Sequence, residues 1–274
     1  LPPAEHLQFF PWDRLCVNPC SLPLEKCLAR EFPPELPFWN DYMKIYNRLQ
    51  ESPDYQEMQE AVREALNPAP GQILLDVGCG TFNTLLPFAR KKDEMRLIGV
   101  DSTAPALLIA QDQLERIPDR SPEVKLVWYD ALSYLRGMKA QSVNHVAAVN
   151  TLYVMEDAHE ALMEIWRVLA PGGRLVMVDI FRDFKPHKIL FSKIAHRWKA
   201  NRMSTPFMAI LDGVRSLSLL NDNRYLVKLA AQNGKTLDAY ASVLAQTGFD
   251  VLEARKVYAK QAGLYVAQKP KEDE

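Results

Sequence analysis

The chain has 274 residues, which is long for one hydrophobic core and short for two, so we expect one domain that carries an insertion. Its 33 Lys and Arg residues nearly balance its 34 Asp and Glu residues, which excludes a general attraction to nucleic acid or to an anionic membrane. The sequence has no apolar run of about eighteen residues and no N-terminal signal pattern. We therefore expect a cytoplasmic protein without stable membrane insertion.

Prolines are frequent in the first segment, residues 1–37, and they predict an irregular arm on the surface of the protein. Cys16, Cys20 and Cys27 lie in this arm at spacings that match no common zinc or iron–sulfur pattern. The fourth cysteine, Cys79, lies far from them in the chain. We therefore interpret all four cysteines as free thiols and predict no metal site.

A helical cap is predicted over residues 38–66, ahead of the first strand of the core. Tyr42 and Tyr46 are separated by one helical turn and so share one face of this segment. Two interpretations have equal weight: the tyrosines line a ligand site at the edge of the core, or they only pack the helix on the sheet. Tyr46 is the candidate ligand-binding residue of this segment.

The most informative stretch joins the apolar strand Ile73–Val77 to a turn that holds Gly78 and Gly80. Such an apolar run is typical of a parallel strand covered on both faces, and glycines let a ligand lie directly on the backbone. Asp76 repels a pyrophosphate but suits a cation such as the amino group of a methionine moiety. A dinucleotide site also needs a third glycine at the position of Asn83. The stretch therefore favours S-adenosylmethionine as the cofactor.

These residues resemble motif I of the class I S-adenosylmethionine-dependent methyltransferases, whose loop is an acidic residue, any residue and then G-x-G-x-G. Phe82 stands at the third glycine of that pattern, so it either walls the methionine pocket or marks a loop that no longer binds. Pro87 is tolerated only in the first turn of a helix, which predicts a helix from about Asn83 or Thr84. The resemblance implies that these loop residues bind the cofactor: Asp76, Gly78, Cys79, Gly80 and Asn83.

Two later strands, predicted at residues 96–100 and 124–129, also lead into acidic residues. Asp101 follows the glycines by about twenty residues, where an exposed carboxylate can hold both ribose hydroxyls. At Asp130 the resemblance implies a carboxylate that accepts from the exocyclic amine of adenine. The predicted cofactor-binding residues at these two strand ends are Asp101, Ser102, Asp130 and Ala131.

The remaining elements continue the alternation of strands and helices. The segment Ile165–Leu175 resembles the helix-to-strand corner of small-molecule methyltransferases, including those of ubiquinone and menaquinone biosynthesis. The fold class predicted is α/β: a Rossmann-like seven-stranded, mostly parallel sheet with helices on both faces, an antiparallel last strand and a helical lid insertion. These elements are expected at residues 143–149 (strand), 158–169 (helix), 174–181 (strand), 237–246 (helix), 250–260 (strand) and 263–268 (strand).

The domain organisation follows from an extra segment between the fifth and sixth strands, residues 183–235, which is longer than this fold needs. Its amphipathic stretch Lys188–Trp198 has a basic side, which fits either a helical lid over the substrate or a solvated helix face. The methyltransferase core is then expected at residues 38–182 and 236–269, followed by a charged tail at 270–274.

Methyl transfer needs alignment of two reactants and exclusion of water, and a hydroxyl acceptor also has to lose a proton. His187 and His196, both in the predicted lid, are the candidate bases by location alone. Tyr153 is expected to orient the acceptor, because in the family the residues beyond the fourth strand face the transfer site. Asn150, at the end of that strand, is the last predicted cofactor-binding residue.

The residues directly after the fourth strand narrow the acceptor class. Methyltransferases that act on nucleic-acid bases carry Asn or Asp, two prolines and an aromatic there, whereas this chain reads Asn150-Thr151-Leu152-Tyr153. We therefore predict no nucleic-acid partner and a small, largely apolar or aromatic metabolite, methylated on oxygen, nitrogen or carbon. A prenyl diphosphate or a protein acceptor stays open, as do a nicotinamide-dependent oxidoreductase and a non-catalytic binding protein. The protein is expected to be a monomer or a homodimer.

Overall fold

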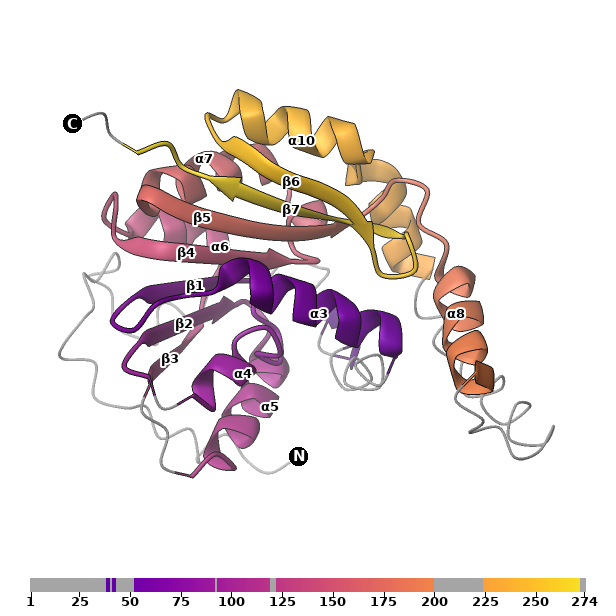
Figure 1. Ribbon diagram of the computed structural model, residues 1–274, viewed down its shortest axis with the longest axis horizontal. Coiled ribbons are helices and arrows are strands. Elements are labelled where there is room, and N and C mark those ends of the chain that lie inside the picture. The colour runs from indigo at the N-terminus through magenta and orange to yellow at the C-terminus, as the bar shows by residue number, and fades with distance from the viewer. Residues whose placement is uncertain are drawn as a thin grey trace.

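The computed structural model describes residues 38–39, 41–42, 52–91, 93–118, 122–199 and 224–271, apart from the side chains of residues 190, 193–194 and 197–199. These residues form one seven-stranded sheet with helices on both faces (Figure 1). The predicted arm at residues 1–37, Tyr46 and the end of the predicted tail lie outside the described residues. None of the helices in the described ranges is long and apolar enough to cross a membrane.

The strands lie in the order β3-β2-β1-β4-β5-β7-β6. All pairings are parallel except those of β7, which runs antiparallel to both β5 and β6. This arrangement confirms the predicted fold class. The bounds are β1 Ile73–Val77, β2 Arg96–Asp101, β3 Glu123–Trp128, β4 Val143–Val149, β5 Leu169–Ile180, β6 Asp250–Val257 and β7 Ala262–Gln268.

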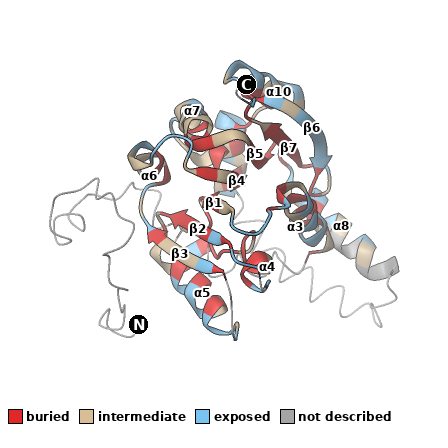
Figure 2. Cartoon of the chain, turned by 60° about the vertical axis from the view of Figure 1, so that its left-hand side comes forward, coloured by how far each residue is buried: buried red, intermediate tan, exposed pale blue. Residues whose placement is uncertain are grey.

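Helices cover the sheet on two sides, and each side has its own apolar core. On one side α3, α4 and α5 pack on the strands, and on the other side α6, α7 and α10 do so. Figure 2 shows the buried residues concentrated in the strands and on the helix faces turned toward them. The bounds are α3 Pro53–Leu66, α4 Leu86–Ala89, α5 Ala104–Glu115, α6 Ala131–Gly137, η3 Leu152–Val154, α7 Ala158–Val168, α8 Pro186–Lys199 and α10 Leu237–Gln246.

The strand order reverses between β1 and β4, because the chain adds β2 and β3 on one side of β1 and β4 onward on the other. Ligands of open α/β sheets bind at such a point, beyond the carboxyl ends of the strands. The glycine turn after β1 and the loop after β4, residues 150–154, meet there. The topology therefore places the predicted motif at the crevice of the sheet.

Several element boundaries differ from the sequence prediction. Helix α4 begins at Leu86 and not at Asn83 or Thr84, because Phe82 takes a left-handed backbone with φ 67° and turns follow it. Pro87 still lies in the first helical turn, as its missing N–H requires. Strand β6 ends at Val257 and not at Lys260, because Tyr258 to Lys260 all have positive φ and form the hairpin turn to β7.

A third boundary was also wrong: β5 begins at Leu169, directly after α7, and so contains the glycine corner that was expected to precede it. The pairing of β5 with β4 shifts register between Val143 and His145. Gly173 fits there because a Cβ would lie 2.9 Å from the backbone oxygen of Asn144. The corner is therefore an irregular start of the strand, consistent with the purely structural role expected of its glycines.

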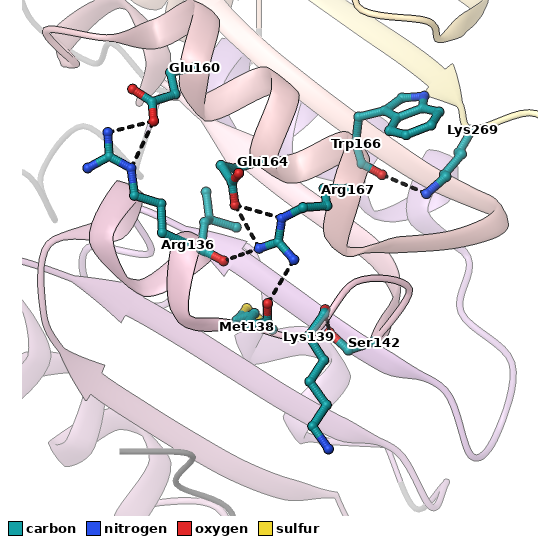
Figure 3. A network of polar contacts seen from close by, with 10 residues as sticks. Arg136, Met138, Lys139, Ser142, Glu160, Glu164, Trp166, Arg167 and Lys269 are labelled. Carbon is teal, nitrogen blue, oxygen red and sulfur yellow. Dashed lines mark hydrogen bonds and ion pairs between the residues drawn. The ribbon is translucent and has the colours of Figure 1, made fainter. Parts of the chain in front are cut away.

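Polar contacts fasten this end of the sheet (Figure 3). Arg167 on α7 donates to the backbone oxygens of Leu135 and Met138, at 2.7 and 2.8 Å, and so caps the end of α6. Lys269, after β7, donates through Nζ to the oxygens of Trp166 and Leu169 at 2.9 Å. Its ammonium also lies 4.0 Å from the centre of the Trp166 ring. This network holds α6, α7 and the start of β5 together, at the end of the sheet opposite the crevice.

The described parts of the insertion at residues 183–235 include two helical segments, α8 and residues 224–233. Ser192 on α8 donates to Asp54 on α3 at 2.9 Å. Asn233 donates to the backbone oxygen of Tyr153 at 3.0 Å. The two ends of the insertion thus contact α3 and the loop after β4. Its role as a substrate lid stays a prediction.

Candidate active site

The glycine turn after β1 is shaped by two left-handed glycines, Gly78 with φ 70° and Gly80 with φ 50°. The N–H groups of Gly78 and Cys79 donate to the carbonyl oxygen of Val100 at 2.9 and 3.0 Å. A Cβ on Gly78 would lie 2.4 Å from Cγ2 of Thr151, so no larger residue fits there. The turn is therefore held between the end of β2 and the loop after β4.

Asp101 anchors this turn from the end of β2. Its carboxylate accepts from the N–H of Gly80 at 2.8 Å and from the N–H of Thr103 at 2.7 Å. The expectation of an exposed carboxylate was wrong, because Asp101 is only 9% exposed. Burial raises its pKa, and the hydrogen bonds from the two N–H groups and from the Thr103 side chain oppose that rise. The carboxylate keeps lone-pair capacity for a further donor, such as a ribose hydroxyl.

Asp76 lies at the end of β1 and is 1% exposed, and among the described residues neither of its oxygens has a hydrogen-bond partner. Burial, with the neighbouring charge of Asp101 as the second cause, raises its pKa to about 8. Asn150, at the end of the adjacent strand β4, has φ 55° and a buried Oδ1 that also lacks a partner. Three orphaned oxygens at two neighbouring strand ends fit a group that offers several N–H donors and a positive charge.

The predicted adenine side is built from the ends of β2 and β3. Asp130 is exposed and caps α6 by accepting from the N–H of Ser133 at 2.7 Å, while Ala131 is buried. Trp128 was not among the predicted site residues, yet its indole N–H donates to the backbone oxygen of Ser102 at 2.9 Å. The sequence signal that could have found it is an aromatic residue at the end of the strand, two positions before Asp130.

Three loop residues have structural partners of their own. Phe82 is fully buried and belongs to the same apolar core cluster as Cys79, so its ring packs into the protein. Cys79 is 7% exposed, and burial followed by the charges of Asp101 and Asp76 raises its thiol pKa. Asn83 donates to the hydroxyl of Thr81 at 2.7 Å. Cys79 therefore stays a neutral thiol, and the loop keeps its turn without a third glycine.

The candidate catalytic residues are not all in one place. Tyr153 lies in η3, 4% exposed, in the loop after β4. His187 and His196 lie on α8, which packs against α3. His187 is exposed and its ring lies 6.1 Å from that of Phe191, whereas His196 is half-buried. The catalytic roles of Tyr153, His187 and His196 stay predictions.

Aromatic side chains gather beside the insertion. The ring of Phe38 stacks on that of Tyr42 with centroids 5.3 Å apart and lies 4.4 Å from that of Tyr225. Trp39 meets Tyr42 edge to face at 5.8 Å. Tyr42 belongs to the same apolar cluster as Tyr153. The packing interpretation of Tyr42 is therefore supported, and Tyr46 lies outside the described residues. No group of three or more His, Cys, Asp or Glu side chains that could hold a metal occurs within the described ranges.

Sheet order, glycine turn and acidic strand ends together define the class I S-adenosylmethionine-dependent methyltransferase fold. Residues 75–177 match the family model of a methyltransferase domain, so this part of the chain is such a domain. The match contains the turn, both later acidic strand ends and the loop after β4.

Curated relatives agree with this class. The O-methyltransferase rstn1 of Aspergillus nomiae is 30% identical over 128 residues, which are 47% of this chain and 55% of that protein. A demethylmenaquinone methyltransferase of Thermus thermophilus is 32% identical over 126 residues, 46% of this chain and 54% of that protein. The chain thus spans about half the length of the curated relatives it matches.

A solved structure of similar fold is the N-methyltransferase NodS of Bradyrhizobium japonicum in complex with S-adenosyl-L-homocysteine. Its TM-score is 0.53 at 17% identity, and the match covers 90% of this chain and 96% of that one. At this identity the likeness concerns the fold alone.

Proposed function

We propose that this protein transfers the methyl group of S-adenosylmethionine to a small, largely apolar or aromatic acceptor. The observation that carries the proposal is the pair of unpartnered oxygens on Asp76, buried beside a glycine turn that Asp101 holds in place. A buried carboxylate without a partner is unfavourable unless a cation completes it. The ammonium of a methionine moiety is such a cation, whereas a pyrophosphate would be repelled.

Different residues of the chain would bind different parts of the cofactor. Asp76 and Asn150 would hold the ammonium, Asp101 the ribose hydroxyls, and Asp130 with Ala131 the adenine edge. When bound, S-adenosylmethionine supplies a methyl group on a positively charged sulfur. The protein then has to align an acceptor in line with that bond and exclude water, which lowers a barrier by about 7 to 11 kcal/mol in well-oriented systems.

The apolar surroundings support an apolar or aromatic acceptor. One continuous core cluster includes Cys79 in the glycine turn, Tyr153 after β4, Phe184 and Leu226 in the insertion, and Tyr42 in the cap. Tyr153 would orient the acceptor at the transfer site. The names of the relatives include O-methyltransferases and quinone C-methyltransferases, so oxygen and carbon acceptors are both in the proposed range.

Two titrations test the cofactor by calorimetry. S-adenosylhomocysteine should bind with a micromolar constant, corresponding to about −8 kcal/mol, and NADPH should not bind. Asp76→Asn should weaken S-adenosylhomocysteine binding by about tenfold or more, because a charge-assisted contact is lost. Asp112→Asn is the matched control, since this exposed carboxylate on α5 pairs with Arg116 on the surface. Tight NADPH binding without S-adenosylhomocysteine binding would replace this proposal with an oxidoreductase.

Transfer itself is tested with a tritium-labelled methyl donor and four probe acceptors: catechol, 2-naphthol, an aryl amine and a hydroxylated naphthoquinone. Label on any of them supports an enzyme for aromatic acceptors. Trp39→Ala should then raise the acceptor KM several-fold, whereas Trp166→Ala, far from the site, should not. The non-catalytic alternative would be favoured by a different result: S-adenosylhomocysteine binds, but no label is transferred to any probe, to a prenyl diphosphate or to added protein.

A further inference from the structure

Asp179 is a buried acid that the proposed cofactor site does not use. It lies on β5 one residue before the strand ends, is 0% exposed and pairs in register with Gly263 on β7. Side chains alternate along a strand, so Asp179 shares a sheet face with Met177, which packs in the core beneath α10. Asp76 shares a sheet face with Leu74, which packs in the other core. The two acids therefore lie on opposite faces of the sheet.

Several donors surround the Asp179 carboxylate. The backbone N–H groups of Thr151, Leu152 and Tyr153 and the hydroxyl of Tyr240 face it, although none reaches full hydrogen-bond distance and angle. Burial raises the pKa of Asp179, and the three N–H groups oppose that rise. Successive N–H groups that converge in a turn form a concave site for a negatively charged oxygen.

The donors belong to the loop after β4, residues 150–154, which carries the residues expected to meet the two reactants. Thr151 lies against Gly78 of the glycine turn, and Tyr153 is the candidate for orienting the acceptor. From the other side, Asn233 of the insertion donates to the oxygen of Tyr153 at 3.0 Å. The loop after β4 therefore has the Asp179 carboxyl group beside its N–H groups on the β5 side and a hydrogen bond from Asn233 on the insertion side.

We propose that Asp179 is a positioning residue for methyl transfer: through the N–H groups of Thr151, Leu152 and Tyr153 it sets the place of the loop after β4 relative to the glycine turn. Its link to turnover rests on the proposed function, whereas its hold on the loop does not. Asp179 touches neither reactant in this scheme. Tyr240, whose hydroxyl faces the carboxylate, supports it from α10.

Hydrogen exchange followed by mass spectrometry tests the hold on the loop directly. Asp179→Asn keeps the shape but replaces one of the two acceptor oxygens with an NH2 donor, so the amides of residues 151–153 should exchange about tenfold faster, while those of β1 stay unchanged. The matched control is His145→Gln, which alters another buried polar group on the neighbouring strand β4, far from its carboxyl end. This control should leave residues 151–153 at the wild-type rate. Unchanged exchange at 151–153 in Asp179→Asn would overturn the proposal.

Turnover is the second readout, measured with whichever probe acceptor the wild type methylates. Asp179→Asn should lower kcat about tenfold while the dissociation constant of S-adenosylhomocysteine changes less than twofold, because the cofactor contacts are intact. Equal loss of affinity and rate would mean general damage and would count against positioning. If the wild type methylates no probe, the proposed function fails, but the exchange result still decides the role of Asp179.

A second variant covers the case in which Asp179→Asn does not fold. Tyr240→Phe removes only the hydroxyl that faces the carboxylate and keeps the ring, which lies 5.6 Å from that of Tyr265. It should raise exchange at residues 151–153 by about two- to threefold. If a folded Tyr240→Phe protein exchanges the amides of residues 151–153 at the wild-type rate, that result alone contradicts the proposal.

Discussion

The ring of Phe82 lies directly against the bare Cα of Gly99: a Cβ on Gly99 would be 2.9 Å from both Cδ2 and Cε2 of the ring. Phe82 stands where the family loop has its third glycine, and Gly99 stands in the middle of β2. The missing side chain in the strand therefore makes room for the extra side chain in the loop. Phe82 also keeps the left-handed backbone that a glycine would take, with φ 67°.

This complementarity predicts coupling between the two positions. Gly99→Ala should destabilise the protein by about 1 to 3 kcal/mol, because the added methyl overlaps the ring in a packed core. In a Phe82→Ala background the same change should cost clearly less. Some cost should remain, since the Cβ would also lie 2.8 Å from Sγ of Cys79. Urea unfolding of the two single variants and the double variant measures the coupling.

One experimental result would contradict the predicted coupling. If the costs of Gly99→Ala and Phe82→Ala simply add, the two residues do not share one space, and the room for the ring comes from elsewhere. Phe82→Ala alone should cost about 3 to 5 kcal/mol, as expected for a fully buried aromatic side chain. It should not abolish binding of S-adenosylhomocysteine, because the ring points into the core.

Asp101→Asn should damage both binding and stability. An amide oxygen replaces only one of the two carboxylate oxygens, so either Gly80 or Thr103 loses its acceptor. The expected loss of stability is about 1 to 3 kcal/mol, because a buried N–H is left unsatisfied. Affinity for S-adenosylhomocysteine should fall by about tenfold or more. Calorimetry and urea unfolding measure the two effects, with Asp112→Asn as the control; a fully stable Asp101→Asn protein would contradict the anchoring role.

The strands could be predicted from the sequence because a parallel strand covered on both faces is a continuous apolar run. Ile73–Val77 and Val143–Val149 are mostly apolar, and their bounds agree with the structure. The boundaries that failed depend on backbone angles and register. The left-handed Phe82 delays α4, and the shift of β4 against β5 draws the glycine corner into the strand. Neither is visible in the local pattern of apolar residues.

The site could be predicted only as far as its residues lie in motifs. Asp76, Gly78, Gly80 and Asp101 are brought to one crevice, as the order of strands implies, although their cofactor roles remain predictions. The burial of Asp101 was missed, because its partner Gly80 is 21 positions away in the chain. The role proposed for Asp179 could not be predicted either, since it depends on N–H groups of the loop after β4, which is distant from Asp179 in the chain.

Binding of S-adenosylhomocysteine should release a proton from Asp76. Burial and the charge of Asp101 raise the pKa of Asp76 to about 8, so the free protein holds a proton there near pH 6.5. A bound ammonium favours the carboxylate and lowers that pKa, so up to one proton leaves and affinity rises between about pH 6 and pH 8. Calorimetry in buffers of different ionisation enthalpy counts the protons. A binding enthalpy independent of the buffer would show that Asp76 does not meet the ammonium.

Stability should also depend on pH through Asp76 in the free protein. The folded state holds a proton that the unfolded state, with a pKa of 3.8, has already lost at neutral pH. Stability therefore falls as pH rises from about 4 through about 8, since the folded state binds more protons in that window. Asp76→Asn should remove this slope and be more stable than the wild type near pH 8. If the difference in stability between the wild type and Asp76→Asn stays constant between about pH 4 and pH 8, the raised pKa of Asp76 is wrong.

His145 should make the protein sensitive to acid between about pH 6.5 and pH 4, where its effect on stability opposes that of Asp76. It lies on β4 and is 9% exposed, its Nε2 lies 2.8 Å from Oε1 of Gln72, and burial with the charge of Arg174 lowers its pKa to about 4. Between about pH 6.5 and pH 4 the unfolded state binds a proton that the folded state does not, so stability falls as pH falls. The full difference corresponds to about 3 kcal/mol. Urea unfolding of the wild type and of His145→Gln at several pH values measures it. The variant should be less stable at neutral pH but lose less stability on acidification, and parallel pH curves for the two proteins would contradict this role of His145.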